Sequence, residues 1–378
     1  MIFFMTMTGG GRRSFFKTVA AAGVLAATET EAAARPLTEK EKLDRIASNT
    51  WPIRHLFKGW PNVRPNANGS ISPALVDRSL ADRMQKKYGE ITMLDFPQFT
   101  KDRFPGVTHM DLFSGLFGDV SDGSMFVEQT GLFDGNPRTS REFDPLSAGG
   151  RKWLDKMAAK MAATGTTCQH ISNNAPLDLC DLGNGLRRRG IEVAKKWIEG
   201  VAVLGAKSMR VNSGGPRVAP AAVPDRASGY PKNDLLAKYL TACIESFKEM
   251  ADFGGKHGVR VTLENHWGLT ANPVNIRIVI DEVNHPFCEA SPDFCNWEHE
   301  YLMYNALRDL APYAHTNVHA KYWDRWGDNN DIQRSTRIML AAGFRGTFAL
   351  EYESGPWDGV EGAQYVFKEV MAALGTAA

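Results

Sequence analysis

Four short apolar segments in the last third of the chain, each ending near a polar residue that can bind a metal, constrain the fold most. They cover residues 261–267, 290–297, 316–321 and 347–353, and their polar residues are Glu264, Asp293, His319 and Glu351. These four residues are 29, 26 and 32 positions apart by their numbers. A strand, a helix and two loops take about 30 residues. The spacing therefore predicts four consecutive βα units, each with one polar group at the carboxyl end of its strand.

The rest of the chain continues the alternation of strands and helices. Helices are predicted over residues 38–47, 94–104, 151–163, 190–204, 234–257, 274–282, 300–311, 331–342 and 362–374. Further strands are predicted over residues 49–57, 106–113, 166–172 and 207–215. The Gly- and Pro-rich stretches 59–89 and 114–149 are predicted to be an insertion and a long loop. Eight alternating strands predict an α/β fold, a (β/α)₈ TIM barrel with extended loops after its early strands.

The four polar residues are predicted to meet, because the carboxyl ends of the strands surround the active site in such a barrel. Three carboxylates and one imidazole form an oxygen-rich site for one divalent cation, with Mn²⁺ as the first expectation and Mg²⁺, Co²⁺ or Zn²⁺ as alternatives. The alternative interpretation is four unrelated polar residues that follow buried strands. No motif for a dinucleotide cofactor or a P-loop occurs in the sequence.

A cation held in this way can bind the carbonyl and an adjacent hydroxyl of a sugar and acidify the neighbouring C–H group. Glu264 and Glu351 lie on different predicted strands, so they could approach opposite faces of a bound carbon. One would remove a proton and the other would return it, which predicts isomerisation or epimerisation through an enediolate. The alternative is that both glutamates are ligands only and another group is the base.

Three residues close to the predicted ligands are candidates for substrate binding. Lys321 and His266 each lie two residues beyond a ligand, so their side chains leave the strand on the same face as that ligand. Arg325 lies six residues after His319, in the following loop, and could bind a substrate oxygen. The alternatives are ion pairing with Glu351 or Glu353 for Lys321, a structural role for His266 and loop ordering for Arg325.

Two weaker candidates for substrate contact are His170 and Asn212, which end the third and fourth predicted strands, with core hydrogen bonding as the alternative for each. Four of the nine tryptophans follow the predicted ligands into the loops: Trp267, Trp297, Trp323 and Trp357. Aromatic rings provide rigid walls that stack on sugars, so Trp267 and Trp323 are predicted to bind substrate. Packing of the loops is the alternative for these rings.

The N-terminal segment has the pattern of an export signal. Paired arginines at 12 and 13 precede the apolar stretch 18–27 and three alanines at 32–34. This order is typical of a twin-arginine signal, with a Sec signal or a basic tail as alternatives. We therefore expect residues 1–34 to be a signal peptide, residues 35–378 to form a single barrel domain, and the protein to reach the periplasm.

The charge argues against nucleic acid and membrane surfaces as partners, and the cysteine pattern argues against a zinc motif. The net charge of +1 gives no electrostatic basis for binding nucleic acid or an anionic membrane surface. No apolar run of 18 residues follows the signal, so the sequence predicts no spanning helix there. The five scattered cysteines form no zinc motif, and we expect most of them to be buried thiols. A disulfide between Cys288 and Cys295 is the alternative for that pair.

The segments Val261–Gly268, Pro292–Asn296, Val318–Lys321 and Ala349–Glu353 together resemble the xylose isomerase-like TIM-barrel superfamily, the sugar phosphate isomerase/epimerase group. The resemblance covers about residues 46–374. Its ketose 3-epimerase branch implies that Glu264, Asp293, His319 and Glu351 bind the metal, that the two glutamates are the acid–base pair, and that Arg325 matches an arginine of that branch.

This chain departs from that branch at Asn296, where the branch has a histidine three residues after the ligand aspartate. Asparagine can bind a hydroxyl or a water but cannot act as an acid at neutral pH. Endonuclease IV-like members of the superfamily need a histidine-rich zinc cluster, which these segments do not supply.

The sequence thus predicts an exported, metal-dependent isomerase or epimerase that acts on a sugar or a sugar derivative. One alternative is a lyase or hydrolase that uses the same proton abstraction on an oxidised (keto) glycoside and expels its aglycone. A second alternative is a non-catalytic carbohydrate-binding barrel. The expected partner is a small sugar or glycoside, and homo-oligomer formation remains open.

Overall fold

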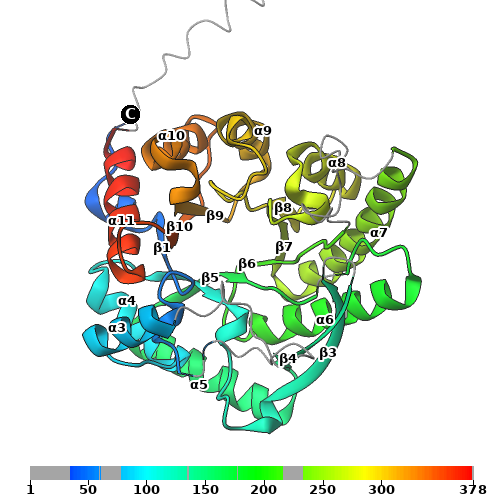
Figure 1. Cartoon of the computed structure of the whole chain (residues 1–378), viewed down its shortest axis with the longest axis horizontal. Coiled ribbons are helices and arrows are strands. Elements are labelled where there is room, and N and C mark those ends of the chain that lie inside the picture. Colours follow the sequence, from blue (N-terminus) through cyan, green and yellow to red (C-terminus); the bar gives the residue numbers. More distant parts are fainter. Residues whose placement is uncertain are drawn as a thin grey trace, which may run out of the picture. The chain divides into compact units, whose positions relative to one another are not determined.

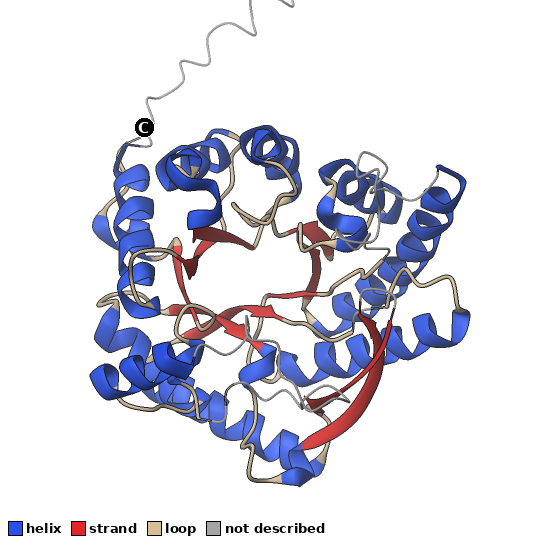
Figure 2. Ribbon diagram, in the orientation of Figure 1, coloured by secondary structure: helices blue, strands red, loops and turns tan. Residues whose placement is uncertain are grey.

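The structure, a computed structural model, describes residues 35–58, 60, 78–133, 136–176, 178–215 and 233–376. Eight parallel strands form one sheet: β1 (Ile46–Asn49), β2 (His109–Phe113), β5 (Thr167–Ser172), β6 (Ser208–Arg210), β7 (Arg260–Leu263), β8 (Cys288–Ala290), β9 (Asn317–Trp323) and β10 (Thr347–Ser354). Their order is β8-β7-β6-β5-β2-β1-β10-β9, and an isolated parallel bridge between Asp293 and His319 joins the two edges. The strands form the ring at the centre of Figure 2, so the predicted TIM barrel is confirmed.

Helices surround this ring of strands (Figure 1). They are α2 (Glu39–Leu43), α3 (Arg78–Tyr88), α4 (Phe96–Arg103), α5 (Ala148–Thr164), α6 (Asn184–Ala202), α7 (Asn233–His257), α8 (Pro273–Val283), α9 (Met303–Leu310), α10 (Ile332–Ala341) and α11 (Gly359–Thr376). Each predicted helix from residue 151 onward overlaps one of them. Among the described residues, no helix combines the length and the apolar character that crossing a bilayer requires.

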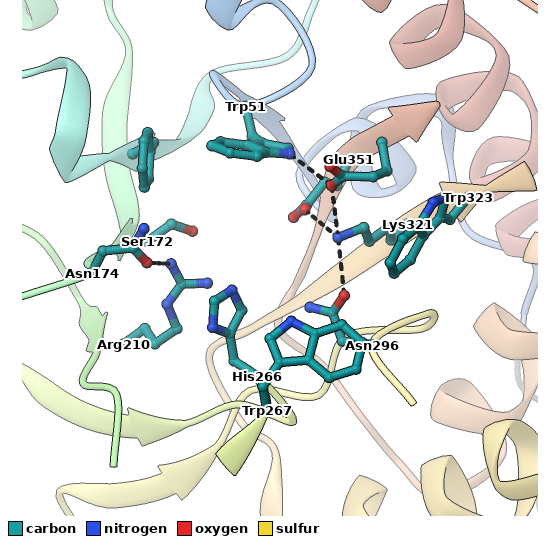
Figure 3. Close-up of a pocket in the computed structure, with 12 residues that line it drawn as sticks. Trp51, Ser172, Asn174, Arg210, His266, Trp267, Asn296, Lys321, Trp323 and Glu351 are labelled. Atoms are coloured by element: carbon teal, nitrogen blue, oxygen red, sulfur yellow. Dashed lines mark hydrogen bonds and ion pairs between the residues drawn. The ribbon is translucent and has the colours of Figure 1, made fainter. Parts of the chain in front are cut away.

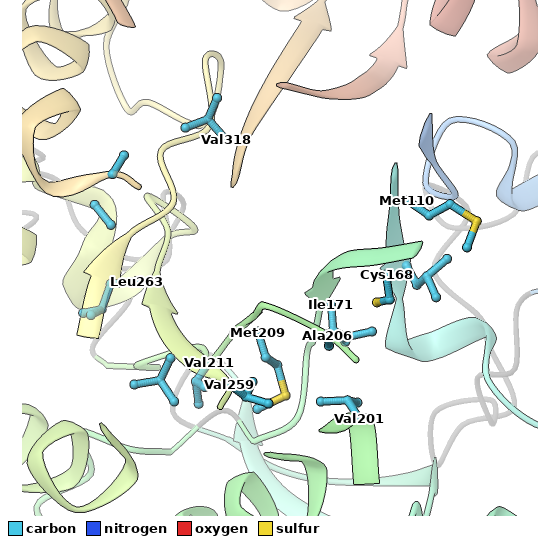
Figure 4. Close-up of a cluster of buried hydrophobic side chains, with 14 of the residues drawn as sticks. Met110, Cys168, Ile171, Val201, Ala206, Met209, Val211, Val259, Leu263 and Val318 are labelled. Atoms are coloured by element: carbon cyan, nitrogen blue, oxygen red, sulfur yellow. The ribbon is translucent and has the colours of Figure 1, made fainter. Parts of the chain in front are cut away.

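The main hydrophobic core lies between the strands and the helices. Met110 of β2, Met209 of β6 and Val201 of α6 are buried there (Figure 4). Because successive side chains of a strand point to opposite faces, the residues between these apolar positions point into the barrel. Asp111 and Arg210 occupy such alternate positions and are buried as well. The apolar side chains thus fix which polar side chains enter the barrel interior.

The prediction of one long loop over residues 114–149 was wrong. The segment contains an antiparallel hairpin of β3 (Phe126–Phe133) and β4 (Asn136–Phe143). Its base packs on the barrel domain, since the Phe143 ring contacts Phe117 and Trp153 at centroid distances of 5.8 and 5.3 Å. Glycine and aspartate content indicated a loop, but the cross-strand pairing of the two segments decides the structure.

The boundaries predicted for the first helix and the first strand were also wrong. The N-terminal helix ends at Leu43 rather than at residue 47, and β1 begins at Ile46 rather than at residue 49. β1 is buried at all four positions because it pairs with both β10 and β2. The segment predicted as strand one leads instead into a short 3-10 helix, Arg54–Leu56. Of the insertion 59–89, residues 59 and 61–77 lie outside the described residues, and its last part forms α3.

The strand β8 is shorter than predicted, and the two cysteines near it form no disulfide with each other. The strand covers Cys288–Ala290, and Asp293 follows it as part of the isolated bridge. Cys288 and Cys295 are both buried free thiols, as are the other three cysteines. The expectation of buried thiols is therefore confirmed, and the alternative disulfide does not form.

Candidate metal centre and substrate cavity

The four polar residues predicted to meet do lie together inside the barrel. Nδ1 of His319 is 3.2 Å from Oε2 of Glu264, 3.6 Å from Oε2 of Glu351 and 3.8 Å from Oδ2 of Asp293. His319 lies on β9 and Glu351 on β10, Glu264 directly follows β7, and Asp293 lies in the loop after β8. All four residues are buried. Three carboxylates therefore converge on one nitrogen of the imidazole ring.

Among the described residues, two atoms of this group, Nδ1 of His319 and Oδ2 of Asp293, have no hydrogen-bond partner although both are fully buried. Leaving such polar atoms unsatisfied costs about 1–3 kcal/mol each. A divalent cation among these oxygens and the nitrogen would satisfy both atoms, and this O₃N donor set suits Mn²⁺, Mg²⁺, Co²⁺ or Zn²⁺. The residues present therefore fit a metal ion.

Glu264 and Asp293 are held by the surrounding protein. Nη1 of Arg210 donates to Oε2 of Glu264 at 2.6 Å, and Nδ2 of Asn296 donates to its Oε1 at 3.1 Å. The backbone N–H groups of Cys295 and Asn296 donate to Oδ1 of Asp293 at 2.6 and 2.9 Å. This leaves Oδ2 of Asp293 directed at the centre.

Lys321 places a buried ammonium group beside the same centre. Its Nζ lies 3.0 Å from both Glu351 Oε1 and Glu353 Oε2, and it donates to Oδ1 of Asn296 at 3.1 Å. Burial acts against the charge, but the carboxylates of Asp293, Glu351 and Glu353 raise the pKa of Lys321 well above its ordinary value. Lys321 is therefore a cation held in place by carboxylates.

Burial and neighbouring charges together shift the pKa values of the titratable groups of the centre in different directions. Burial would raise the pKa of Glu264, but Arg210 and His319 lower it well below the ordinary value. Burial raises the pKa of Asp293 to about 7, although Lys321 acts against the shift. Burial would lower the pKa of His319, but the carboxylates of Glu264 and Glu351 raise it well above the ordinary value. The centre thus carries an excess of negative groups that attracts either a proton or a cation.

The opposite nitrogen of His319, Nε2, has a different environment. It lies 2.9 Å from Oδ2 of Asp111 and 3.1 Å from Oγ of Ser172. Asp111, His170 and His319 also bring three potential ligand atoms close together. In that group Nδ1 of His170 is bonded to Ser208 at 2.7 Å and both oxygens of Asp111 have partners, whereas Nε2 of His170 has no hydrogen-bond partner among the described residues. One carboxylate lies near Nε2 of His319, whereas three converge on its Nδ1. We therefore assign the metal centre to the Nδ1 side of His319.

A cavity of about 160 Å³ opens above the centre, with Lys321 and Glu351 on its wall (Figure 3). Aromatic side chains form much of its lining: Trp51, Phe113, Trp267 and Trp323. The polar lining consists of Ser172, Asn174, Arg210, His266, Asn296, Lys321, Glu351 and Glu353. A cavity lined by four aromatic rings and a larger number of polar groups suits a small polar ligand such as a sugar.

Most of the predicted substrate-binding residues line this cavity. Lys321, His266, Asn296, Trp267 and Trp323 do so, the Trp267 and Trp323 rings being 6.4 Å apart in an edge-to-face arrangement.

Other predicted site residues lie outside the cavity lining. The Arg325 guanidinium lies 5.6, 5.1 and 4.5 Å from the ring centroids of Trp267, Trp323 and Trp326. His170 lies deeper in the barrel, 5.8 Å from the His319 ring. Nδ2 of Asn212 donates to the side chain of Asn174 at 3.3 Å.

Several residues of the site were missed in the sequence. Asp111, Ser172 and Arg210 contact the predicted ligands, and Trp51 donates from Nε1 to Oε2 of Glu353 at 2.8 Å. The sequence indicated Glu353 only as an ion-pair partner of Lys321, and that pair forms at 3.0 Å. The available signal was their place at or near strand ends, between apolar residues that face the helices. That signal was weak in the early units, because their long insertions disturb the spacing.

The closed parallel barrel, with polar side chains gathered at the carboxyl ends of its strands, defines the class of TIM-barrel proteins. Within that class, the family model described as "Xylose isomerase-like TIM barrel" matches residues 123–373. Because the match spans more than half of the chain, the chain belongs to this family. A search of the curated proteins gave no match.

Solved structures of the same superfamily have the same fold at low sequence identity. A xylose isomerase-like TIM-barrel protein from Mycobacterium smegmatis, in complex with magnesium, is 16% identical with a TM-score of 0.51, covering 89% of this chain and 100% of that one. The 3-keto-D-glucoside 4-epimerase from E. coli is 14% identical with a TM-score of 0.51, covering 73% and 94%. An L-ribulose 3-epimerase is 15% identical with a TM-score of 0.52, covering 88% and 95%. Sugar epimerases are thus among the structural neighbours, and at this identity the likeness shows the fold.

Proposed function

We propose that the protein is a metal-dependent enzyme that moves a proton next to the carbonyl of a sugar or sugar derivative, as an isomerase or epimerase. The observation that carries the proposal is the group of Glu264, Asp293 and Glu351 around the buried Nδ1 of His319, beneath a cavity with aromatic side chains in its lining. This nitrogen has no hydrogen-bond partner among the described residues. The sugar epimerases among the structural neighbours support the same class of reaction.

The metal would be held by Glu264, Asp293, His319 and Glu351. When bound, it supplies a Lewis acid that polarises the carbonyl of the substrate and makes the adjacent C–H group more acidic. Mn²⁺ remains our first expectation, with Mg²⁺, Co²⁺ and Zn²⁺ as alternatives. The magnesium complex of a structural neighbour supports a divalent cation in general.

The two glutamates differ in their freedom to carry a proton. Glu351 lines the cavity, where one of its oxygens forms an ion pair with Lys321 at 3.0 Å. Both oxygens of Glu264 are bonded, to Arg210 and Asn296, and Glu264 does not line the cavity. We therefore assign proton removal to Glu351. Lys321 lies beside it on the cavity wall and would place its positive charge next to an enediolate oxygen.

The second candidate function is cleavage of an oxidised (keto) glycoside. Such a lyase removes one proton beside the carbonyl and expels the aglycone, so it needs no second carboxylate on the far face of the carbon. The engagement of Glu264 by Arg210 and Asn296 favours this reaction. Glu351 would remove the proton in either case, and the products distinguish the two reactions.

The test is metal analysis of the purified protein, followed by incubation with keto-sugars and keto-glycosides in D₂O. We expect about one divalent ion per chain and uptake of deuterium at the carbon beside the carbonyl. Glu351→Gln should lower the rate of exchange about 10²–10⁴-fold. The buried Glu289→Gln, at the other end of the barrel, is the matched control and should keep the wild-type rate.

The products and the metal content decide between the candidates. An isomeric sugar supports the isomerase or epimerase, whereas a free aglycone supports the lyase. A protein that binds no divalent metal and exchanges no proton, but still binds sugar in EDTA, would be a carbohydrate-binding barrel and the proposal would be rejected.

We also propose that the protein is exported by the twin-arginine route to the periplasm. The support is the sequence pattern of residues 1–34, which lie outside the described residues. A fusion of residues 1–40 to a fluorescent protein should reach the periplasm of wild-type bacteria. The same fusion with Arg12→Lys and Arg13→Lys should stay in the cytoplasm, and periplasmic fluorescence of this variant would contradict the twin-arginine assignment.

A further inference from the structure

His319 is placed between two polar groups that use different nitrogens of its ring. Nδ1 faces the three carboxylates at 3.2–3.8 Å, and Nε2 faces Asp111 at 2.9 Å. A neutral imidazole carries its proton on one nitrogen and a lone pair on the other. Only a nitrogen with a lone pair can bind a metal, so the partner of Nε2 decides whether Nδ1 is available.

Asp111 is itself held in place from several strands. Its Oδ2 also accepts a hydrogen bond from Nδ2 of Asn317 at 3.0 Å, and its Oδ1 accepts one from Oγ of Ser172 at 2.8 Å. Oγ1 of Thr347 donates to Oδ1 of Asn317 at 2.7 Å, which orients the amide. Asp111 is completely buried. Its carboxylate is therefore anchored by β5, β9 and β10 and presents a fixed acceptor to His319.

An ionised carboxylate accepts hydrogen bonds and donates none. The hydrogen bond between Asp111 and Nε2 therefore requires the proton to be on Nε2. The lone pair of a neutral His319 ring is then on Nδ1, directed at Glu264, Glu351 and Asp293. Asp111 does not line the cavity, so this effect does not involve contact with the substrate.

We propose that Asp111 is a positioning residue, which holds the proton of His319 on Nε2 and so presents Nδ1 as a metal ligand. This inference rests on the proposed metal-dependent function. It adds a residue from β2, outside the four units that supply the ligands, and 208 positions from His319 in the sequence.

The test uses Asp111→Asn in the full chain. The Asn side chain keeps the size of Asp but can donate to Nε2, which favours the proton on Nδ1 and opposes metal binding. After removal of metal with EDTA, Mn²⁺ and Co²⁺ binding is measured by titration calorimetry and by the visible spectrum of bound Co²⁺. We expect the variant to bind about 10–100-fold more weakly than wild type. Glu289→Gln, a buried acid-to-amide change away from the site, should keep the wild-type affinity.

A second measurement reads the proton directly. In the Zn²⁺-loaded wild-type protein, long-range ¹H–¹⁵N spectra should show His319 protonated on Nε2 and not on Nδ1. A merely structural role for Asp111 would lower the melting temperature of Asp111→Asn and leave the dissociation constant and the Co²⁺ spectrum unchanged. If the variant does not fold, Asn317→Ala replaces it, because it removes one anchor of Asp111 and should weaken binding several-fold.

The outcomes separate this inference from the proposed function. Unchanged metal affinity in Asp111→Asn, or in Asn317→Ala where the first variant does not fold, would overturn the role of Asp111 while the metal site stands. A proton found on Nδ1 of wild-type His319 would do the same. A wild-type protein that binds neither Mn²⁺ nor Co²⁺ would overturn both proposals.

Discussion

Two carboxylates of the same βα unit, Asp293 and Glu289, differ mainly in what surrounds them. Both are buried, and burial raises the pKa of each to about 7. Each has one oxygen that accepts from the backbone, from two N–H groups in Asp293 and from one in Glu289, and one oxygen without a hydrogen-bond partner among the described residues. Asp293 follows the carboxyl end of β8, whereas Glu289 meets the start of the β9 unit through Thr316.

The environment of the unpartnered oxygen separates the two residues. Oδ2 of Asp293 faces an unpartnered nitrogen of His319, and Glu264 and Glu351 approach the same nitrogen. Oε2 of Glu289 faces Nε of the partly exposed Arg260 at 3.8 Å. An unsatisfied buried oxygen is therefore not enough to indicate a metal site. Asp293 is distinguished by two additional features. A second atom that can bind a metal, Nδ1 of His319, is also without a hydrogen-bond partner among the described residues, and two further carboxylates converge on it.

The largest expected effect concerns the arginines at the two ends of the barrel. Arg210→Met removes the cation that pairs with the buried Glu264 at 2.6 Å, and should lower the free energy of unfolding by about 3–5 kcal/mol. Arg260→Met, the matched change beside Glu289, should cost at most about 1 kcal/mol because that pair is long and partly exposed. Urea unfolding in EDTA measures both, and equal losses would contradict the comparison.

The pH dependence of the unfolding free energy tests whether burial keeps Glu289 protonated. Burial raises the pKa of Glu289 from 4.5 to about 7, so the folded protein keeps a proton that the unfolded chain releases. The stabilising contribution is complete below pH 4.5 and is lost as the pH rises through about 7. That loss is about 3 kcal/mol at 1.36 kcal/mol per pKa unit.

Glu289→Gln carries no titrating group and removes this contribution. The difference in unfolding free energy between wild type and variant, measured in EDTA from pH 4.5 to pH 8, should change by about 3 kcal/mol. A difference that does not vary with pH would show that the carboxyl of Glu289 is not kept protonated by burial.

The gain in stability on metal addition should depend on the residues of the proposed metal centre and not on Glu289. A cation that binds the folded protein stabilises it by about 2.7 kcal/mol at 100 times its dissociation constant. Wild type and Glu289→Gln should gain this stability with Mn²⁺, and His319→Ala should gain none because it lacks the only nitrogen ligand of the centre. Thermal unfolding with and without EDTA measures the gain, and a full gain in His319→Ala would reject the assigned ligands.

The second half of the barrel could be predicted from sequence because its units are regular. Glu264, Asp293, His319 and Glu351 follow strands at nearly constant intervals, and interval alone indicates that they share one end of the barrel. The start of β1 was not predicted, since pairing with β10, which is distant in sequence, decides it. The hairpin was not predicted because the segment is rich in Gly, Asp and Pro, while the pairing of β3 with β4 decides its structure.

The groups that hold the ligands could not be predicted in the same way. Asp111 and Arg210 look like ordinary polar residues of a strand, and their partners are distant in sequence. Asp111 contacts His319 across 208 positions, and Arg210 contacts Glu264 across 54 positions. A single sequence carries no record of such contacts, so only the closed barrel identifies them.

The smallest expected effect concerns Glu353, a partly buried carboxylate beside Lys321 and Arg54. Burial acts against its charge, but Lys321, Arg54 and Trp51 lower the pKa of Glu353 to about 2. Trp51→Phe removes one neutral hydrogen bond to this group and should cost about 1 kcal/mol of stability. Trp60→Phe is the control. Trp60 packs on Trp51, but its buried Nε1 has no hydrogen-bond partner in the part of the chain that the structure describes, so its loss should cost less. Equal costs for both variants would assign the effect to ring packing and not to the anchoring of Glu353.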